Sequence, residues 1–332
     1  MEGETPIGAR MCTKCYNRHP LMVVPDAGGE VHDPSKGTVY RFCTERFQQK
    51  STLNFDLDRT FDHIEPINSK SSGDNSSSTI FVFVHGGGAS RAMFRAHATD
   101  LKDRYGHASI LMDLPGHGTL VDKPLTLESC ATTMASVLKE CGISASSKQK
   151  IIYVGGSLGA YIGFYLLEQF KDIFDGAVLM DCGQNVGPGS QLHVKMGLSM
   201  LSWMSESMSN ASLMNMMLDV TKKSKTSSYP YHLVDTVFGA GMFFDQGAAQ
   251  VECLRTVAPA EIIPKIPFPI LYMNGAKDHR NSEDLWLELS QKKYPSSELK
   301  VYEDGDHFFM HDARYVDDVL ESMNAYATKL GA

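Results

Sequence analysis

A serine stands at the centre of a glycine-rich turn in this sequence, in the run Gly155-Gly156-Ser157-Leu158-Gly159. The apolar run 151–154 predicts a strand before the turn, and residues 160–170 predict a helix after it. Small residues beside the serine allow the strained backbone dihedrals that a sharp strand-to-helix turn requires. We therefore expect Ser157 to project from the apex of such a turn, where the helix N-terminus favours developing negative charge.

A second glycine-rich turn follows another predicted strand. Residues 79–84 have a strand composition, and the run His85-Gly86-Gly87-Gly88 comes directly after them. Glycines let the backbone approach a ligand closely, so the N–H group of Gly87, in preference to that of Gly86, is expected to point at a carbonyl oxygen. Together with the N–H group of Leu158 it would form a two-donor oxyanion hole. The alternative is an ordinary glycine-rich turn that binds no ligand.

An aspartate and a histidine near the C-terminus follow strands in a similar way. Residues 269–273 predict a short buried strand that leads to Asp278, and residues 299–302 predict another that leads to His307. Ligand sites in open parallel sheets lie at the carboxyl ends of the strands. Ser157, Asp278 and His307 are therefore expected to converge at that edge, in the chain order serine, aspartate, histidine.

Other residues of the same types compete for the two supporting roles, two aspartates for the acid and two histidines for the base. They are Asp181, Asp284, His279 and His311. Asp181 ends the apolar run 176–180, whereas His311 is expected on the loop or first turn before the last helix. Asp278 is the preferred acid because it follows a strand end and precedes the next helix by a short loop.

These motifs together resemble the α/β-hydrolase superfamily. The matching positions are the turn 85–88, the turn 113–118 (Asp-Leu-Pro-Gly-His-Gly), the serine turn 155–159, Asp278 and His307. The resemblance implies a doubly wound, mostly parallel α/β sheet of about eight strands with a helical cap insertion. It also implies that Ser157 is the nucleophile and that His307 is the general base and acid. Asp278 would then hold the imidazole of His307 in the correct tautomer. Branches of this superfamily that open epoxides or remove halides have an aspartate at the position of Ser157. The serine in this chain therefore argues against both activities.

The order of predicted elements divides the chain into three parts. Residues 1–37 form an N-terminal extension, residues 38–182 and 260–332 form the hydrolase core, and residues 183–259 form the cap, since the alternation of strands and helices lapses there. Antiparallel strands that open the core are predicted over 38–47 and 50–57. Core helices are predicted over 92–105, 127–141, 158–170, 282–293 and 313–330.

Methionines recur every four residues in the predicted cap, at Met196, Met200, Met204 and Met208. One interpretation is the buried face of a cap helix. The other is a pocket wall, because an unbranched, polarisable side chain adapts to irregular apolar ligands. The candidates for substrate contact are Gly86, His193, Trp203, Met204, Phe238, Met242 and Phe243.

Composition restricts the partners of the chain. A net charge of −8 over 332 residues disfavours nucleic acid and anionic membranes. No apolar run is long enough to span a bilayer, and no terminal segment resembles a targeting signal, so a cytoplasmic protein is expected. The seven cysteines are scattered, which fits reduced thiols in that compartment.

One pair of cysteines has the spacing of metal ligands. Cys12 and Cys15 stand close together, with His19, His32 and Cys43 as further donors. Structural zinc takes a second compact ligand pair, and the sequence has none here. We therefore expect neither a metal nor another cofactor.

Three functions remain open for a small-molecule substrate. The first is a serine hydrolase that cleaves a carboxylic or thiol ester with an apolar part through an acyl-enzyme intermediate. The second keeps the same triad and cleaves a carbon–carbon bond next to a ketone, or opens a lactone. The third is a non-enzymatic binder of small molecules with the same fold. The complete set of Ser157, Asp278 and His307 favours the first.

Overall fold

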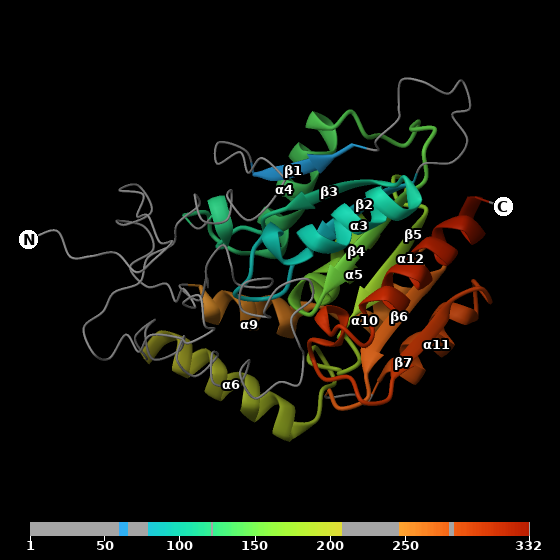
Figure 1. Cartoon of the computed structure of the whole chain (residues 1–332). Helices are drawn as coiled ribbons and strands as arrows, with labels where there is room; N and C mark the ends of the chain where they lie inside the picture. The colour runs from blue at the N-terminus through green and yellow to red at the C-terminus, as the bar shows by residue number, and fades with distance from the viewer. Residues whose placement is uncertain (1–59, 66–78, 121, 208–245, 279–281, 332) are drawn as a thin grey trace, which may run out of the picture.

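The computed structural model describes residues 60–65, 79–120, 122–207, 246–278 and 282–331 (Figure 1). Within them one sheet has the strand order β1-β3-β2-β4-β5-β6-β7, and only β1 is antiparallel to its neighbour. The strands are β1 (Phe61–Ile64), β2 (Ile80–Val84), β3 (Ala108–Met112), β4 (Ile151–Gly156), β5 (Gly176–Met180), β6 (Ile270–Gly275) and β7 (Glu298–Tyr302). The mostly parallel α/β sheet that the sequence predicts is confirmed, with seven described strands.

Both faces of this sheet are apolar, because successive buried side chains along a strand point to opposite faces. In β2, Phe81 and Phe83 belong to one buried cluster, and Val82 and Val84 belong to the other. Successive side chains of a strand point to opposite faces, so a strand that is apolar at every position needs cover on both.

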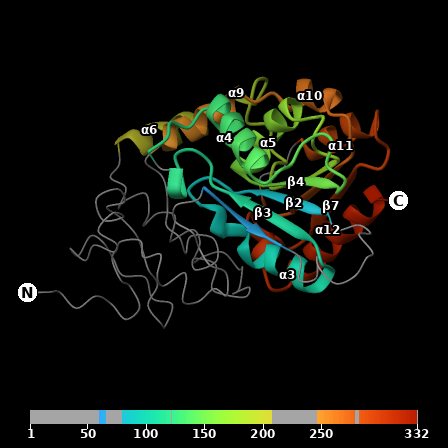
Figure 2. The same cartoon turned by 90° about the horizontal axis from the view of Figure 1, so that it is seen from above.

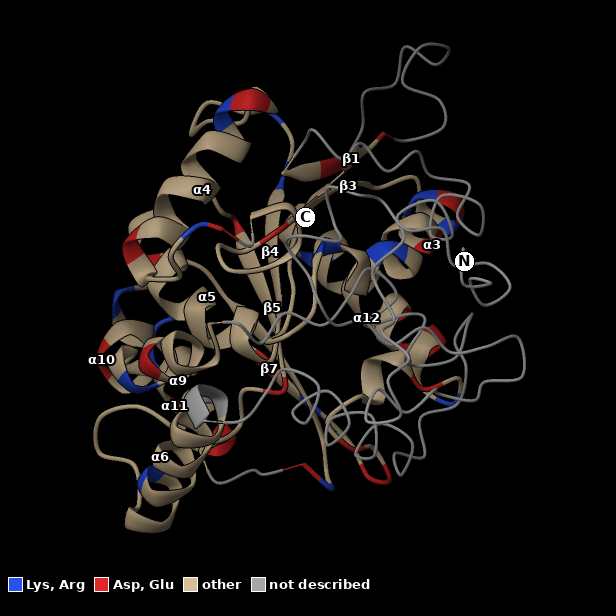
Figure 3. Cartoon of the chain, turned by 90° about the vertical axis from the view of Figure 1, so that its left-hand side faces the viewer, with Lys and Arg blue, Asp and Glu red and all other residues tan. Residues whose placement is uncertain are grey.

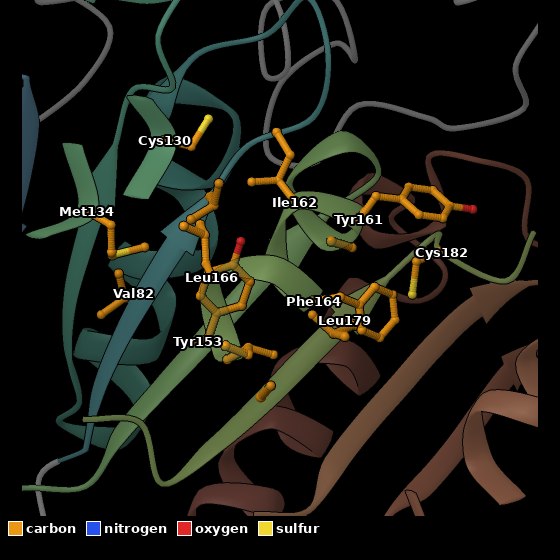
Figure 4. Packing of buried hydrophobic residues seen from close by; sticks show 14 of the residues in the cluster. Val82, Cys130, Met134, Tyr153, Tyr161, Ile162, Phe164, Leu166, Leu179 and Cys182 are labelled. Atoms are coloured by element: carbon orange, nitrogen blue, oxygen red, sulfur yellow. The ribbon is translucent and has the colours of Figure 1, made fainter. Parts of the chain in front are cut away.

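Helices cover the two faces as separate layers (Figure 2). α3 (Arg95–Tyr105) and α12 (Val316–Gly331) contribute to the cluster of Phe81. The other face is covered by α4 (Leu127–Glu140), α5 (Leu158–Gln169), α10 (Pro259–Ile262) and α11 (Glu283–Gln291). Figure 4 shows side chains of α4 and α5 gathered against strands β2, β4 and β5 in this second layer.

The remaining described elements are short or lie beside these layers. They are η2 (Arg91–Phe94), η3 (Gly118–Leu120), α6 (Leu192–Ser207), α9 (Gly247–Thr256), η4 (Ile263–Lys265) and η5 (Phe309–His311). No described helix is long and apolar enough to cross a bilayer. The described cysteines, Cys130, Cys141, Cys182 and Cys253, are thiols without a disulfide.

Local signals explain where helices begin and end. Thr126 and Ser129 cap α4 reciprocally: the Thr126 hydroxyl accepts the N–H of Ser129 at 3.0 Å, and the Ser129 hydroxyl accepts the N–H of Thr126 at 2.9 Å. α3 ends at Gly106, whose φ of 75° lies in the left-handed region that favours glycine. Such pairings satisfy backbone groups that a helix end leaves without a partner.

The predicted core helices occur with shifted boundaries. The expected helix at 92–105 begins as the 3₁₀ turn η2 before α3, and the expected helix at 313–330 begins at Val316, after η5. A 3₁₀ turn tightens the chain at a helix entrance and has no pattern distinct from that of an α-helix. The predicted extension 1–37 and the predicted strands at 38–47 and 50–57 lie outside the described residues, whereas β1 was not predicted.

The described part of residues 183–259 contains α6, α9 and the start of α10, and no strand. α6 buries Val194 and Leu198, while Met196 and Met200 are 64% and 62% exposed. Positions two apart on a helix point about 200° apart, so these methionines lie opposite the buried side. The interpretation of Met196 and Met200 as a buried face was therefore wrong. Figure 3 shows that α6 carries few charged residues.

A buried ion network holds β1, η2 and the turn after β3 together. The Arg91 guanidinium donates to Asp113 at 2.6 Å, and Arg95 donates to Asp62 at 2.5 Å. Burial alone raises the pKa of the Asp113 carboxyl, but the charge of Arg91 and hydrogen bonds from two backbone N–H groups outweigh it and lower the pKa. Gly118 lies so close to this carboxyl that a Cβ there would be 2.3 Å from Asp113 Cγ. Asp113 thus has a structural role in the turn that follows β3.

Five buried histidines are held in the neutral form, and His107 is one of them. Burial lowers the pKa of His97 to about 4 and that of His117 to about 3, and it also lowers the pKa of His85 and His311. In the unfolded chain each histidine has a pKa near 6.5. Below that pH the unfolded state therefore binds more protons than the folded state does. Burial also raises the pKa of the Asp181 carboxyl, which acts in the opposite direction, but the histidines outnumber it.

We therefore expect the free energy of unfolding to fall as the pH drops from about 6.5 toward 4, by about 1.4 kcal/mol per pH unit for each histidine. Calorimetry at pH 7 and pH 5 measures the effect as a loss of Tm. The control is His311→Phe, which keeps a ring stacked on Phe94 but removes one ionisable group, and it should lose less Tm over the same interval. An unchanged or higher Tm at pH 5 would contradict the argument.

Candidate active site

The parallel strands bring four distant residues to one edge of the sheet. β4, β5, β6 and β7 are consecutive neighbours, and their carboxyl ends lead to Ser157, Asp181, Asp278 and His307 respectively. The register pairs Gly156 with Met180 and Met180 with Met273, so these ends lie at one level. Ser157, Asp278 and His307 therefore converge at the strand ends, as expected.

Ser157 occupies the strained apex between β4 and α5. Its φ of 52° and ψ of −117° are sterically unfavourable for a residue with a side chain. The turn is possible because glycines flank it. A Cβ on Gly159 would be 2.3 Å from the Val84 carbonyl oxygen, and one on Gly155 would be 2.7 Å from the Gly159 carbonyl oxygen. The N–H of Ser157 donates to the Met180 carbonyl at 2.9 Å, which ties the apex to β5.

His307 reaches Ser157 because its loop crosses directly over the end of β6. A Cβ on Gly275 would be 2.4 Å from the Asp306 carbonyl oxygen, so only a glycine fits beneath this crossing. The N–H of Lys277 donates to the Gly305 carbonyl at 2.8 Å and fixes the loop against the residues after β6. The histidine from the edge strand β7 is thereby carried back toward the centre of the sheet.

The three predicted side chains form a hydrogen-bonded chain. His307 Nδ1 lies 2.8 Å from Asp278 Oδ2, and His307 Nε2 lies 3.0 Å from Ser157 Oγ. A carboxylate can only accept, so Nδ1 donates to Asp278 and Nε2 accepts from the Ser157 hydroxyl. The imidazole is thus in the tautomer that a general base facing Ser157 requires.

Acidic neighbours favour the protonated form of His307. Burial alone lowers the pKa of this imidazole, but the negative charge of the Asp181 and Asp278 pair, the hydrogen bond to Asp278 and the charge of Asp306 outweigh it. The pKa of His307 is therefore raised above its ordinary value of 6.5. The imidazole is well suited to hold a proton taken from Ser157.

Two backbone N–H groups remain available beside Ser157. The N–H of Gly86 points at Met93 Sδ at 3.2 Å, and the N–H of Gly88 donates to His117 Nε2 at 3.2 Å. Within the described chain, the N–H groups of Gly87 and Leu158 have no such acceptor. A Cβ on Gly86 would be 3.3 Å from Ser157 Cβ, which shows how closely this loop approaches the serine. This placement supports the choice of Gly87 and Leu158 as the donor pair.

Two buried histidines hold the loop that carries Gly87. His85 Nε2 accepts the N–H of Leu114 at 3.0 Å, so its Nδ1 donates to the Gly86 carbonyl at 2.7 Å. His117 Nε2 accepts the N–H of Gly88, so its Nδ1 donates to the Pro115 carbonyl at 2.9 Å. Both bonds to Nε2 require a neutral imidazole, in agreement with the lowered pKa of each ring.

Gln250, which lies over the glycine loop, was not predicted as part of the site. Its Oε1 is 2.6 Å from the point where a Cβ on Gly87 would stand, and its side chain is buried. One turn earlier, Gln246 joins α9 to the loop before α4: its Nε2 donates to the Lys123 carbonyl, and its Oε1 accepts the N–H of Leu125, both at 2.7 Å. The spacing of two glutamines by four residues puts them on one helix face and is the signal that the sequence offers.

The other predicted residues are placed less favourably. Trp203 is 63% exposed on α6 and Met204 is half-buried, while Phe238, Met242 and Phe243 lie outside the described residues. Asp284 is exposed on α11, His311 stacks on Phe94, and His279 lies outside the described residues. The five candidate zinc donors Cys12, Cys15, His19, His32 and Cys43 lie outside them too.

Among the described residues, one group has donor atoms close enough for a metal ion. Asp181, Asp278 and His307 each place a ligand atom within 4.8 Å of the others. Both ring nitrogens of His307 already hydrogen-bond to Asp278 and Ser157, so metal coordination there would break the chain of hydrogen bonds. The donor set fits proton transfer better than metal binding.

Comparison with known proteins identifies the family. The family model described as alpha/beta hydrolase fold matches residues 79–313, which include every strand from β2 to β7. The chain belongs to this family. The comparison with curated proteins found no match.

Solved structures of several hydrolase-fold proteins are similar to this chain. An esterase from Exiguobacterium antarcticum has a TM-score of 0.59 and 16% identity, over 81% of this chain and 94% of that one. MenH from S. aureus has a TM-score of 0.60 and 13% identity, over 82% and 99%. The enol-lactonase from Burkholderia xenovorans LB400 has a TM-score of 0.57 and 15% identity, over 81% and 96%. At these identities the likeness concerns the fold.

The serine turn leads to a stability prediction. In Gly155→Ala the new methyl group would lie 2.7 to 2.8 Å from backbone atoms of Gly159 and Ala160, which cannot rotate away. We expect a loss of about 1–3 kcal/mol in the free energy of unfolding. Urea denaturation measures it.

The matched control for this variant is Gly197→Ala in α6, where an added Cβ meets nothing within 4 Å. That change should be neutral or stabilising by up to about 1 kcal/mol, because alanine favours a helix. Equal denaturation midpoints for the two variants would show that the close approach at Gly155 does not constrain the turn.

Proposed function

We propose that this protein is a serine hydrolase that cleaves carboxylic or thiol esters with an apolar part through an acyl-enzyme intermediate. The observation that carries the proposal is the continuous hydrogen-bonded chain from Asp278 through His307 to Ser157, at 2.8 and 3.0 Å. The strained backbone at Ser157 adds support, because such strain is typical of a nucleophile held at the apex of a turn.

The first half of the reaction forms the acyl-enzyme. Ser157 Oγ attacks the carbonyl carbon of the ester while His307 Nε2 takes the hydroxyl proton. The carbonyl oxygen becomes an oxyanion that accepts hydrogen bonds from the N–H groups of Gly87 and Leu158. His307 then gives its proton to the departing alkoxide or thiolate, and the acyl group stays on Ser157.

The second half repeats these transfers with water. His307 takes a proton from a water molecule as its oxygen attacks the acyl carbon, and returns that proton to Ser157 Oγ as the acid product leaves. Asp278 accepts the Nδ1–H of His307 throughout and stabilises the imidazolium. The raised pKa of His307 suits this role, because the imidazole must hold each proton until the leaving group takes it.

Apolar surroundings of Ser157 support an apolar substrate. Met93 and Phe94 lie close to Gly156, and Leu158 lies close to Gly87, so these buried side chains adjoin both the nucleophile and the proposed donors. We further propose that residues 183–259, with α6 and α9, are the cap over this site. The buried Gln250 of α9 beside Gly87 supports that placement for α9.

The nucleophile is tested by covalent labelling. We expect Ser157→Ala to lose reaction with a fluorophosphonate probe and to lose on the order of 10⁴–10⁶ in kcat toward a p-nitrophenyl ester. The matched control is Ser146→Ala, which changes an exposed serine and should retain both. Labelling of Ser157→Ala at the wild-type rate would exclude Ser157 as the nucleophile.

The substrate class is tested with p-nitrophenyl esters of increasing acyl length, together with a thioester and a lactone. Because a cap encloses a finite space, kcat/KM should be highest for short-to-medium acyl chains and fall for long ones. The lactone is included because an enol-lactonase shares the fold. A steady rise of kcat/KM to very long chains would contradict an enclosed site, and binding without turnover of any compound would indicate a non-enzymatic binder.

A further inference from the structure

A second carboxyl group lies beside the triad, on Asp181 at the end of β5. Asp181 is 3% exposed, and its φ of 55° makes it, with Ser157, one of two described non-glycine residues in the left-handed region. Its N–H donates to the Met273 carbonyl at 3.1 Å, so the backbone is held in place between β5 and β6. Aspartate and asparagine tolerate this conformation better than other residues with a side chain.

The Asp181 carboxyl is directed toward His307. One of its oxygens lies within 4.8 Å both of a ring nitrogen of His307 and of a carboxyl oxygen of Asp278. Among the described residues, neither Asp181 oxygen has a hydrogen-bond partner within 3.5 Å, although the nearby backbone N–H of Gly275 lowers the pKa of this carboxyl. A buried carboxyl without partners is costly in either protonation state unless a nearby group can exchange a proton with it.

Two carboxylates this close cannot both remain ionised at low cost. Burial raises the pKa of Asp181 well above 3.8, the positive charge of His307 lowers it, and the charges of Asp278 and Asp306 raise it again. Asp278 is the less buried of the pair and already accepts a hydrogen bond from His307, so it is the one that carries the charge. Cys182 and Tyr161 lie near Asp181, and burial keeps their thiol and phenol neutral by raising their pKa values.

We propose that Asp181 is a positioning residue of this site: only one of the two carboxyls is ionised at a time, and Asp181 accepts the Nδ1–H of His307 when Asp278 is neutral. The inference rests on the proposed triad for its catalytic consequence, but its structural part does not. In the resting site Asp181 holds the proton and Asp278 holds the charge. When Asp278 is neutral, Asp181 is ionised and takes over the orientation of the imidazole.

Asparagine substitutions test this pair without disturbing the fold. Asn keeps the shape of Asp and tolerates the left-handed backbone at residue 181. The set is Asp181→Asn, Asp278→Asn and the double variant. The matched control is Asp306→Asn, which removes a third carboxylate that faces His307 but lies outside the cluster of donor atoms.

The first measurement is the low-field proton NMR signal of His307 Nδ1–H, assigned by its absence in His307→Ala. It needs no turnover, so it decides the inference even if the protein hydrolyses no ester. We expect the signal to persist in Asp278→Asn and to disappear in the double variant. Its loss in Asp278→Asn alone would overturn the proposal, because Asp181 would then not hold the ring.

The second measurement is the steady-state kinetics of the same variants on the best ester. Asp181→Asn should cost less than about threefold in kcat in the wild-type background and about tenfold more in the Asp278→Asn background. Equal costs in both backgrounds would mean that the two carboxyls act independently, which contradicts the proposal. A wild-type protein that neither turns over esters nor reacts with the fluorophosphonate probe would refute the proposed function, while the NMR result would still stand.

The pH dependence of kcat/KM separates a neutral Asp181 from an ionised one. Activity requires neutral His307, so kcat/KM increases as the pH rises through the pKa of His307. Asp306→Asn removes a charge that raises this pKa and should move the rise to lower pH. Asp181→Asn exchanges one neutral group for another and should leave the rise unchanged. A shift as large as that of Asp306→Asn would show that Asp181 is ionised and would overturn the proposal.

Discussion

The site depends on close approaches between backbones that only glycine permits. Gly159 lies against the carbonyls of Val84 and His85, and Gly275 lies beneath the carbonyls of Gly305 and Asp306. The first contact lets α5 begin directly behind Ser157, and the second lets the loop after β7 pass over β6. Without the second contact His307 would stay near the edge of the sheet, away from the strand that carries the serine.

Burial of polar groups organises the surroundings of these contacts. Asp113 and Arg91 form an ion pair beneath the loop of Gly87, and His85 and His117 bind its backbone as neutral rings. Each buried group has partners of fixed geometry, so the loop has few alternative conformations. The same arrangement makes the fold sensitive to acid, because a protonated imidazole cannot accept the hydrogen bond that a backbone N–H group donates to its Nε2.

Much of the site was predictable because its signals are local. The strand before Ser157, the glycines around it and the helix after it are contiguous, and the strands before Asp278 and His307 are short apolar runs. The interpretation of Met196 and Met200 failed because periodicity reveals a helix face but not the side on which a neighbour packs. Gln250 was missed for a related reason: its position depends on how α9 is joined to the loop before α4.

Sequence alone was enough to predict the family, the alternation of strands and helices that follows β1, and the three residue types at the strand ends, since each follows from a short motif and its neighbours. That Asp181 lies beside the same imidazole as Asp278 is visible only in the folded chain. Both aspartates follow apolar strands, and the sequence left Asp181 as an alternative to the preferred Asp278. Which of them accepts a hydrogen bond, and which is buried without one, depends on the path of the loop that carries His307 across β6, and that path is fixed by packing rather than by local sequence.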